Sequence, residues 1–197
     1  MNADEYLVFD FETTGLSPSR DRIIQVGLCH VSNGVAASRQ SWFVRQDVPI
    51  HPVAMRLHGI TAEKIQEHGI PPHDSLARLI EEMRTAPVLV GHNIHRFDVP
   101  FLLAECRRLH MEPPNCAEFI DTAALFKGMK LRLAKRPLEN HRDYADRVLS
   151  IPVRGLSYSI ETCIGELGIE LDTSQLHDAA QDAFATSLIF RALRHLT

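Results

Sequence analysis

Apolar residues gather in short runs early in the chain and recur at helical spacing further on. Residues 6–11 are apolar or aromatic apart from one aspartate, and residues 23–31 form a second apolar run. Residues 38–44 carry the single Trp and predict a third strand. Runs of this length, bounded by Gly, Ser, Asn and Pro, are typical of β-strands. The Asn33–Gly34 pair predicts a hairpin, so part of the sheet is expected to be antiparallel.

Later residues predict helices between two further strands. Residues 74–84 show the clearest helical spacing behind an N-capping Asp74, and a short helix is expected after Thr61. Residues 88–91 and 118–121 predict strands, and residues 98–109, 157–167 and 179–196 predict helices. Together these elements predict an α/β fold, a mixed sheet flanked by α-helices, in a single domain over residues 1–197.

Residues 127–155 fit this pattern poorly. The segment is polar, and five basic residues precede its first acidic residue: Lys127, Lys130, Arg132, Lys135 and Arg136. We expect a basic insertion or surface arm here, helical around residues 142–149. A solvated face, a nucleic-acid contact and a dimer interface are the roles open to it.

Charge and cysteine content narrow the function classes. With 21 basic and 25 acidic residues, the net charge is −4, so nucleic-acid binding would rest on a local patch or on bound cations. An acidic N-terminus and the lack of a long apolar run predict no secretory signal, no membrane span and a cytoplasmic location. The cysteines show no paired metal-ligand spacing. We expect buried free thiols in a reducing compartment: Cys29, Cys106, Cys116 and Cys163.

Two acidic groups are candidates for metal-dependent chemistry. Asp10 and Glu12 are two residues apart on a strand, so both side chains leave the same face. Two like charges this close favour a cation between them, and carboxylate oxygens suit a hard divalent ion. Asp98 opens a helix directly after a strand, where a metal ligand and a helix N-cap are both open interpretations.

A third group opens the last predicted helix. Asp178 and Asp182 share a helical face at i and i+4, which is unfavourable without a cation. His177 lies near the helix start, where its neutral form is available for proton transfer. Alone, each of these groups also has a structural explanation: strand-end acids, a helix cap or a surface histidine.

Taken together, the motifs resemble those of a known family. They are Asp10-x-Glu12-Thr13-Thr14-Gly15-Leu16, then Asn93 with Phe97-Asp98, then His177-x-Ala179-x-x-Asp182-Ala183, with His58-Gly59-Ile60-Thr61 between the first two. In this order and spacing they resemble the motifs of the DEDDh, or DnaQ-like, 3′-to-5′ exonucleases over about residues 6–193. The resemblance implies a ribonuclease-H-like fold with a five-stranded mixed sheet.

The resemblance also implies a mechanism. Such enzymes hydrolyse phosphodiester bonds at the 3′ end of single-stranded DNA or RNA and release nucleoside 5′-monophosphates with two divalent cations, Mg²⁺ or Mn²⁺. By this resemblance Asp10, Glu12 and Asp182 ligate the first ion. Asp10 bridges to the second ion, which Asp98 supports. His177 is the implied general base for the attacking water.

Substrate contacts follow from the same resemblance. The implied positions are Thr13, Thr14, Leu16, His58 and Asn93. Leu16 is expected to wedge against the terminal bases. Thr14 as a turn residue, and His58 and Asn93 as structural hydrogen-bonding residues, are alternatives. His92 and His95 are expected to be structural.

Two other function classes stay open. A non-catalytic nucleic-acid- or polymerase-binding scaffold on this fold is expected to have lost one of the five catalytic residues, yet all are present. A small-molecule phosphatase has no use for the Leu16 wedge. The partners considered are single-stranded 3′ ends, a homodimer, and a polymerase or another nucleic-acid-processing protein.

Two features narrow the enzyme subclass. A chain end just after Leu196 would leave no tail for polymerase docking. Thr13 argues against an oligoribonuclease.

Overall fold

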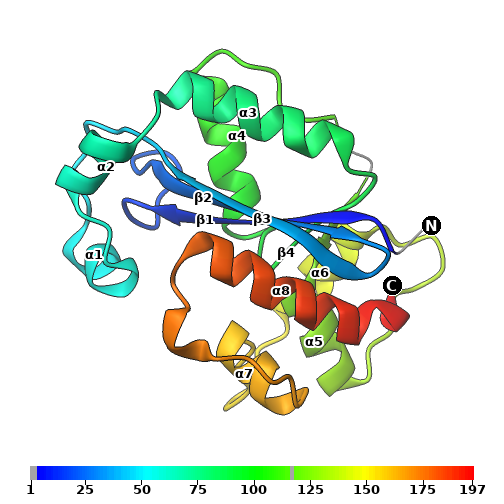
Figure 1. The fold of residues 1–197 in the computed structure, drawn as a ribbon. Helices are drawn as coiled ribbons and strands as arrows, with labels where there is room; N and C mark the ends of the chain where they lie inside the picture. Colours follow the sequence, from blue (N-terminus) through cyan, green and yellow to red (C-terminus); the bar gives the residue numbers. More distant parts are fainter. Residues whose placement is uncertain (1–3, 116–117) are drawn as a thin grey trace.

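A five-stranded mixed sheet with helices on both faces forms the frame of the molecule (Figure 1). The computed structural model describes residues 4–115 and 118–197. The sheet order is β3-β2-β1-β4-β5, with β1 antiparallel to β2 and parallel to β4. The strands are β1 (Tyr6–Thr13), β2 (Ile23–Ser32), β3 (Val35–Phe43), β4 (Leu89–Gly91) and β5 (Phe119–Asp121). The predicted mixed five-stranded sheet is therefore confirmed.

Helices cover the sheet unequally. In Figure 1, α3 and α4 lie on one face, α5 to α8 lie on the other, and α1 and α2 lie beyond one end of the sheet. The helices are α1 (Pro52–His58), α2 (Ala62–His68), α3 (Pro72–Thr85), α4 (Asp98–Arg108), α5 (Thr122–Leu131), α6 (His141–Ser150), α7 (Ile160–Glu166) and α8 (Ala179–Leu193). Short 3₁₀ turns follow at Thr173–Gln175 and Arg194–Leu196. No described helix combines the length and the apolar composition needed to cross a membrane.

Alternation along β1 decides which side its acidic residues face. Leu7 and Phe9 pack in the core beneath α3 and α4, whereas Tyr6 and Val8 pack in the core beneath α5, α6 and α8. Successive side chains of a strand point to opposite faces. Asp10 therefore continues the row of Tyr6 and Val8, on the side that α8 covers.

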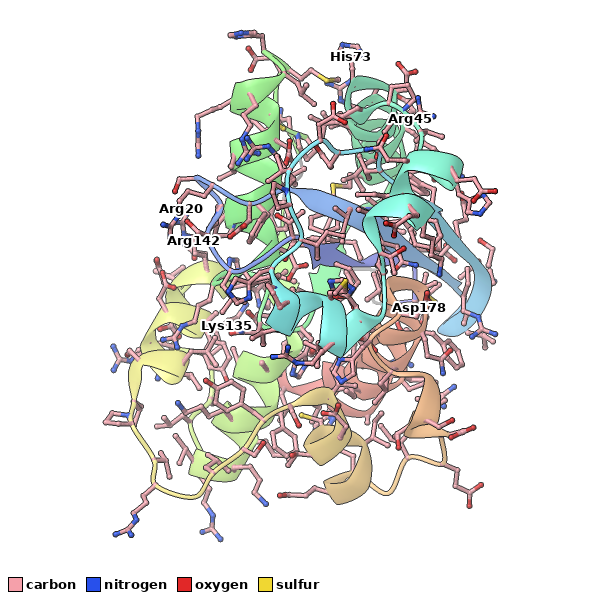
Figure 2. All side chains as sticks on the ribbon, turned by 90° about the vertical axis from the view of Figure 1, so that its left-hand side faces the viewer. Arg20, Arg45, His73, Lys135, Arg142 and Asp178 are labelled. Atoms are coloured by element: carbon pink, nitrogen blue, oxygen red, sulfur yellow. The ribbon has the colours of Figure 1, made fainter. Side chains whose placement is uncertain are left out.

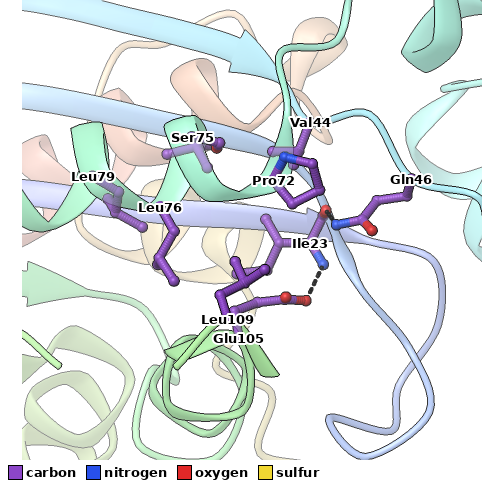
Figure 3. Close-up of a pocket in the computed structure, with 10 residues that line it drawn as sticks. Ile23, Val44, Gln46, Pro72, Ser75, Leu76, Leu79, Glu105 and Leu109 are labelled. Atoms are coloured by element: carbon purple, nitrogen blue, oxygen red, sulfur yellow. Dashed lines mark hydrogen bonds between the residues drawn. The ribbon is translucent and has the colours of Figure 1, made fainter. Parts of the chain in front are cut away.

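The core beneath α3 and α4 is closely filled. The gap between these helices and the start of β2 has a volume of only about 10 Å³ (Figure 3). At its edge the Ile23 N–H donates to Glu105 Oε1 at 3.4 Å. A space of this size holds about one water, so this gap belongs to the core and not to a ligand site.

Two local expectations were wrong or incomplete, and the expectation for the cysteines holds where the structure describes them. α3 begins at Pro72 after Pro71, so Asp74 lies in the first turn and not at the N-cap. Proline is favoured there because the first helical N–H groups have no partner within the helix. α1 was not predicted, because it buries no residue and so leaves no apolar periodicity. Of the cysteines, Cys29, Cys106 and Cys163 are buried free thiols as expected, and Cys116 lies outside the described residues.

Residues 127–155 differ from the expected surface arm. Lys127 is 3% exposed within α5, and the following α6 contributes four residues to the core: Tyr144, Ala145, Val148 and Leu149. The Lys127 ammonium donates to the backbone oxygens of Leu149 at 3.1 Å and Ile151 at 2.6 Å. Backbone oxygens at a helix end lack partners within the helix, so the buried lysine satisfies the end of α6. The exposed basic side chains of this segment are spread over α5, the following loop, α6 and the chain after it.

Candidate active site

Three carboxylates meet at the end of β1. Asp10, Glu12 and Asp182 each bring a carboxylate oxygen into a group whose members lie within 4.8 Å of one another. Glu12 and Asp182 are buried, and Asp10 is partly exposed. Three convergent carboxylates from two rigid elements fit a hard divalent cation. The structure thus brings together the three residues implied to hold the first ion.

Close packing of α8 against a glycine of β2 places Asp182 in this cluster. Gly27 of β2 is paired with Asp10 of β1, and a Cβ at Gly27 would lie 2.0 Å from the carbonyl carbon of Ala179. Gln25 fixes the same junction, because its Nε2 donates to Asp178 Oδ2 at 2.8 Å. Asp178 caps α8 by accepting backbone N–H groups of its first turn. Asp178, labelled in Figure 2, therefore has a structural role at the start of the helix.

Asp98 reaches the same end of β1 from the opposite layer. It is the first residue of α4 and only 2% exposed. Its Oδ1 accepts the N–H of Phe11, the residue between Asp10 and Glu12, at 3.1 Å. The N-cap of α4 is Phe97, with no side-chain cap hydrogen bond. Asp98 is thus tied to the acidic strand, although it lies outside the group of three.

Burial dominates the protonation of these acids. It raises the pKa of Glu12 to about 9, of Asp98 to about 8 and of Asp182 to about 6. The pKa of Asp10 is raised well above its usual range, by burial first and then by the charges of Asp98 and Asp182. A carboxyl group that loses water and faces like charges keeps its proton. Full ionisation of the cluster at neutral pH therefore requires compensating cations.

His177 lies at the mouth of the cluster. Its backbone N–H donates to both Asp182 oxygens, at 3.2 and 3.3 Å, from a left-handed backbone with φ of 72°. Its imidazole Nε2 lies 3.8 Å from Oε1 of Glu161 in α7, and both side chains are nearly half exposed. Sequence reasoning missed Glu161, because only the packing of α7 beside the start of α8 brings it near the histidine.

A pocket of about 550 Å³ adjoins the carboxylates. Its apolar walls come from Leu16, from Phe97 and from α1, where Val53 and Leu57 are more than half exposed. Leu16 itself is 84% exposed. An exposed apolar wall around a pocket is the usual character of a ligand site. Among the predicted substrate contacts, the pocket includes Thr13, Leu16 and His58.

His58 is one of the polar residues that line this pocket. Its Nδ1 accepts the Ile60 N–H at 3.0 Å, and burial lowers the pKa of the ring. A neutral ring that accepts at Nδ1 carries its proton on Nε2. That buried Nε2 makes no hydrogen bond of good geometry within residues 4–115 and 118–197, and it interacts weakly with the Thr13 backbone.

Thr14 and Asn93 do not line the pocket. Thr14 is fully buried, and its Oγ1 bonds to Asp21 Oδ1 at 3.2 Å and accepts the Arg22 N–H at 3.0 Å. Its side chain shapes the turn, which matches the alternative of a turn residue. The N–H of Asn93 donates to Asp121 Oδ1 at 2.9 Å. Asn93 Oδ1 has no partner among the residues that the structure describes.

Two residues outside the motifs hold the second motif in place. Asp121 accepts the N–H of Asn93 and caps α5, so one carboxylate joins the ends of β4 and β5. His92 bonds to Thr122 Oγ1 at 2.8 Å and to the Tyr158 backbone oxygen at 2.6 Å. His92 is therefore structural, as predicted. The role of Asp121 was not foreseen, since an Asp before a helix signals only a local cap.

The mixed sheet with helices on both faces, with carboxylates gathered at the end of its first strand, has the ribonuclease-H-like architecture. A family model described as exonuclease (RNase_T) matches residues 7–190. The chain belongs to this exonuclease family. The DnaQ-like resemblance inferred from the motifs is thereby confirmed.

Individual relatives agree with this assignment. The chain is 30% identical over 155 residues to a 3′-5′ exonuclease DinG of Bacillus subtilis, covering 75% of the chain and 16% of that relative. It is 30% identical over 190 residues to a PolC-type DNA polymerase III of Mycoplasmopsis pulmonis, covering 94% of the chain and 11% of the polymerase. The chain thus spans about a sixth or less of these relatives.

Solved structures show the same fold. Escherichia coli exonuclease I in complex with a dA16 oligonucleotide superposes with a TM-score of 0.76 at 21% identity. That match covers 98% of the chain and 41% of exonuclease I.

Gly27→Ala is expected to push the start of α8 away from β2 and to separate Asp182 from Asp10. Affinity for Mn²⁺ should fall at least about tenfold, because misplaced ligands bind metal weakly, as measured by calorimetric titration. Gly165→Ala is the matched control, since nothing lies within 4 Å of its added Cβ. Unchanged Mn²⁺ affinity in a folded Gly27→Ala protein would contradict the glycine contact as the source of the alignment.

The metal-free protein is expected to become less stable as the pH rises from about 5 to 9. In this range the folded carboxyl groups of Glu12, Asp98 and Asp182 retain protons that the unfolded chain has lost, so deprotonation favours unfolding. In EDTA the melting temperature should fall by on the order of 5 °C between pH 6 and pH 8, and Glu12→Gln should flatten this dependence. The exposed Glu170→Gln should leave it unchanged. A flat profile in the native protein would mean that the acids are already ionised without metal.

Proposed function

We propose that the chain is a metal-dependent 3′-to-5′ exonuclease of single-stranded nucleic acid that acts as a single domain over residues 1–197. One observation carries the proposal: three carboxylates converge directly beside an apolar-walled pocket that shares Glu12 with them. The name of the Bacillus subtilis relative supports the 3′-to-5′ direction. The oligonucleotide bound to exonuclease I supports a single-stranded substrate.

The carboxylate cluster fits a pair of divalent cations, Mg²⁺ or Mn²⁺. Asp10, Glu12 and Asp182 would hold one ion, and Asp98 with Asp10 would hold the second. When bound, two such ions supply an activated water and stabilise the leaving 3′ oxygen in an in-line displacement. The protein supplies four acids in fixed positions, and their raised pKa values show that like charge is poorly tolerated there, a repulsion that bound cations would relieve.

His177 would remove the proton from the attacking water. Its side chain is near the carboxylates yet partly exposed, so it can exchange protons with solvent. The carboxylate of Glu161 faces Nε2 of this ring and would orient it. Together the four acids and the histidine form the DEDDh set that the motifs imply.

The pocket would receive the terminal nucleotide. Leu16 and the exposed apolar residues of α1 would contact the base without distinguishing its identity, because every base has an apolar face. The Nε2–H of His58, which has only a weak interaction with the Thr13 backbone, would donate to a polar atom of this nucleotide. Contacts of this kind suit an enzyme that removes each terminal nucleotide whatever its base.

A non-catalytic scaffold is the alternative function. It is disfavoured because a scaffold has no use for four acids buried together at a cost that protons or cations must relieve. A homodimer and a polymerase or other nucleic-acid-processing partner remain predictions, and the polymerase relative supports the second of them.

The direct test uses 5′-labelled single strands of DNA and of RNA with Mg²⁺ or Mn²⁺, resolved at single-nucleotide steps. A ladder that shortens from the 3′ end is expected, and EDTA and Asp182→Ala should each abolish it. Glu170→Ala, an exposed acid away from the cluster, should cleave normally. Intact strands in every lane with folded native protein would favour the scaffold.

His177→Ala is expected to lower kcat by about 10²–10⁴-fold, the range for a lost general base. Mn²⁺ affinity should stay within about threefold, since only the backbone N–H of this residue contacts Asp182. Glu161→Gln should reduce kcat less, because it removes an orienting charge and leaves the base in place. If His177→Ala lost Mn²⁺ binding instead, its role would lie in building the metal site.

A further inference from the structure

A second groove of about 490 Å³ lies next to the candidate active site. We call it the upstream groove. The residues that line it include His95, Val99, Leu103, Phe119, His141 and Arg142. The function proposed above makes no use of it. Its walls come from the start of α4, from β5 and from the start of α6.

One short segment of chain borders both the upstream groove and the 550 Å³ pocket beside the carboxylates, which we call the catalytic pocket. Phe97 lines the catalytic pocket, whereas His95 and Val99, two residues to either side, line the upstream groove. Asp98, tied to the acidic strand through the Phe11 N–H, lies between them. A strand with its last phosphodiester at the carboxylates therefore has to pass this segment to reach the groove.

Two cations border the upstream groove. Arg142 is exposed and has only a weak exposed ion pair, at 4.0 Å from Asp146. Lys135 places its ammonium 3.2 Å from Nε2 of His141, whose side chain is 3% exposed. Burial, followed by the charge of Lys135, lowers the pKa of His141, so the neutral ring accepts from the ammonium and holds it at the rim. A preorganised cation suits a phosphate.

The labelled cations of this region project toward one edge of the molecule. Figure 2 looks toward α1, and in that view the labels of Arg20, Arg142 and Lys135 follow one another down the left edge. Arg20 lines the catalytic pocket and Arg142 lines the upstream groove. The net charge of −4 therefore coexists with a local basic edge.

The floor of the upstream groove has room for a flat apolar group with a polar edge. Val99, Leu103 and Phe119 supply apolar surface. At the edge, Oε2 of Glu118 is buried, makes no hydrogen bond within the described part of the chain and lies 3.9 Å from Nε2 of His141. An unpaired buried acceptor is costly. The amino group of a nucleobase would supply the missing donor.

We propose that the upstream groove binds the nucleotides on the 5′ side of the scissile bond in the strand being degraded. Lys135 and Arg142 contact the phosphates of this strand. One base enters the apolar part of the groove beside Leu103, which we call the base slot. This proposal rests on the exonuclease function proposed above. It makes the enzyme sensitive to strand length, because a strand too short to reach the groove gains nothing from it.

The test compares 5′-labelled oligodeoxycytidylates of 3 and 12 nucleotides, chosen because cytosine carries an amino group. For the native protein, kcat/KM should be higher for the 12-mer. Lys135→Ala/Arg142→Ala should lower the ratio of the two kcat/KM values about tenfold, through KM for the 12-mer. Arg84→Ala/Arg107→Ala, which removes two exposed charges elsewhere, should leave the ratio unchanged. Leu103→Trp, which fills the slot and removes no charge, should lower the ratio too.

The outcomes separate this proposal from the exonuclease function. Cleavage of both oligonucleotides with an unchanged ratio in the double variant would overturn the upstream groove and leave the exonuclease intact. An unchanged ratio in Leu103→Trp alone would overturn the base slot. If the native protein cleaves neither oligonucleotide, the exonuclease fails. In that case, fluorescence anisotropy measures how tightly each protein binds the 12-mer in EDTA. Weaker binding by the Lys135→Ala/Arg142→Ala variant than by the native protein and the control variant supports the groove, and equal binding by all three overturns it.

Discussion

Burial of like-charged carboxylates at the end of β1 is the constraint on which the rest of the site depends. Asp10, Glu12 and Asp182 lie within 4.8 Å of one another, and burial raises the pKa of each. Such a cluster is tolerated only when protons or cations neutralise it. Chemistry and stability are therefore coupled in this protein, because the occupant that relieves the repulsion is also the agent of the proposed hydrolysis.

Regular elements hold the cluster, and this gives it its precision. β1 is buried on both faces, α8 rests on Gly27, and α4 is joined to β1 by the Asp98–Phe11 hydrogen bond. Side chains on packed helices and strands keep their positions better than side chains on loops. The pocket beside the cluster is built differently. Its wall, α1, buries no residue and presents apolar side chains to solvent.

The charged residues of the protein are distributed unevenly between its interior and its surface. The excess of acidic residues includes the buried cluster, and two divalent cations would bring the net charge of −4 close to zero. Lys127, despite its place in a basic segment, is a buried structural lysine at the end of α6. Lys135 and Arg142 border the upstream groove instead. A nucleic-acid-binding role is thus compatible with an acidic composition, since recognition depends on local arrangement.

The sequence by itself determined the mixed sheet, most of the helices and the identity of the acidic motifs. Apolar periodicity and the spacing of Asp10 and Glu12 are local properties, so the sequence alone reveals them. Tertiary structure alone decided which of the motif residues meet. It placed Thr14 in a buried turn, brought Glu161 to His177 and folded α6 into the core. Such contacts join segments that are far apart in the sequence, and they form only when particular faces pack together. The close packing of α8 against Gly27 is an example, because no local sequence pattern indicates it.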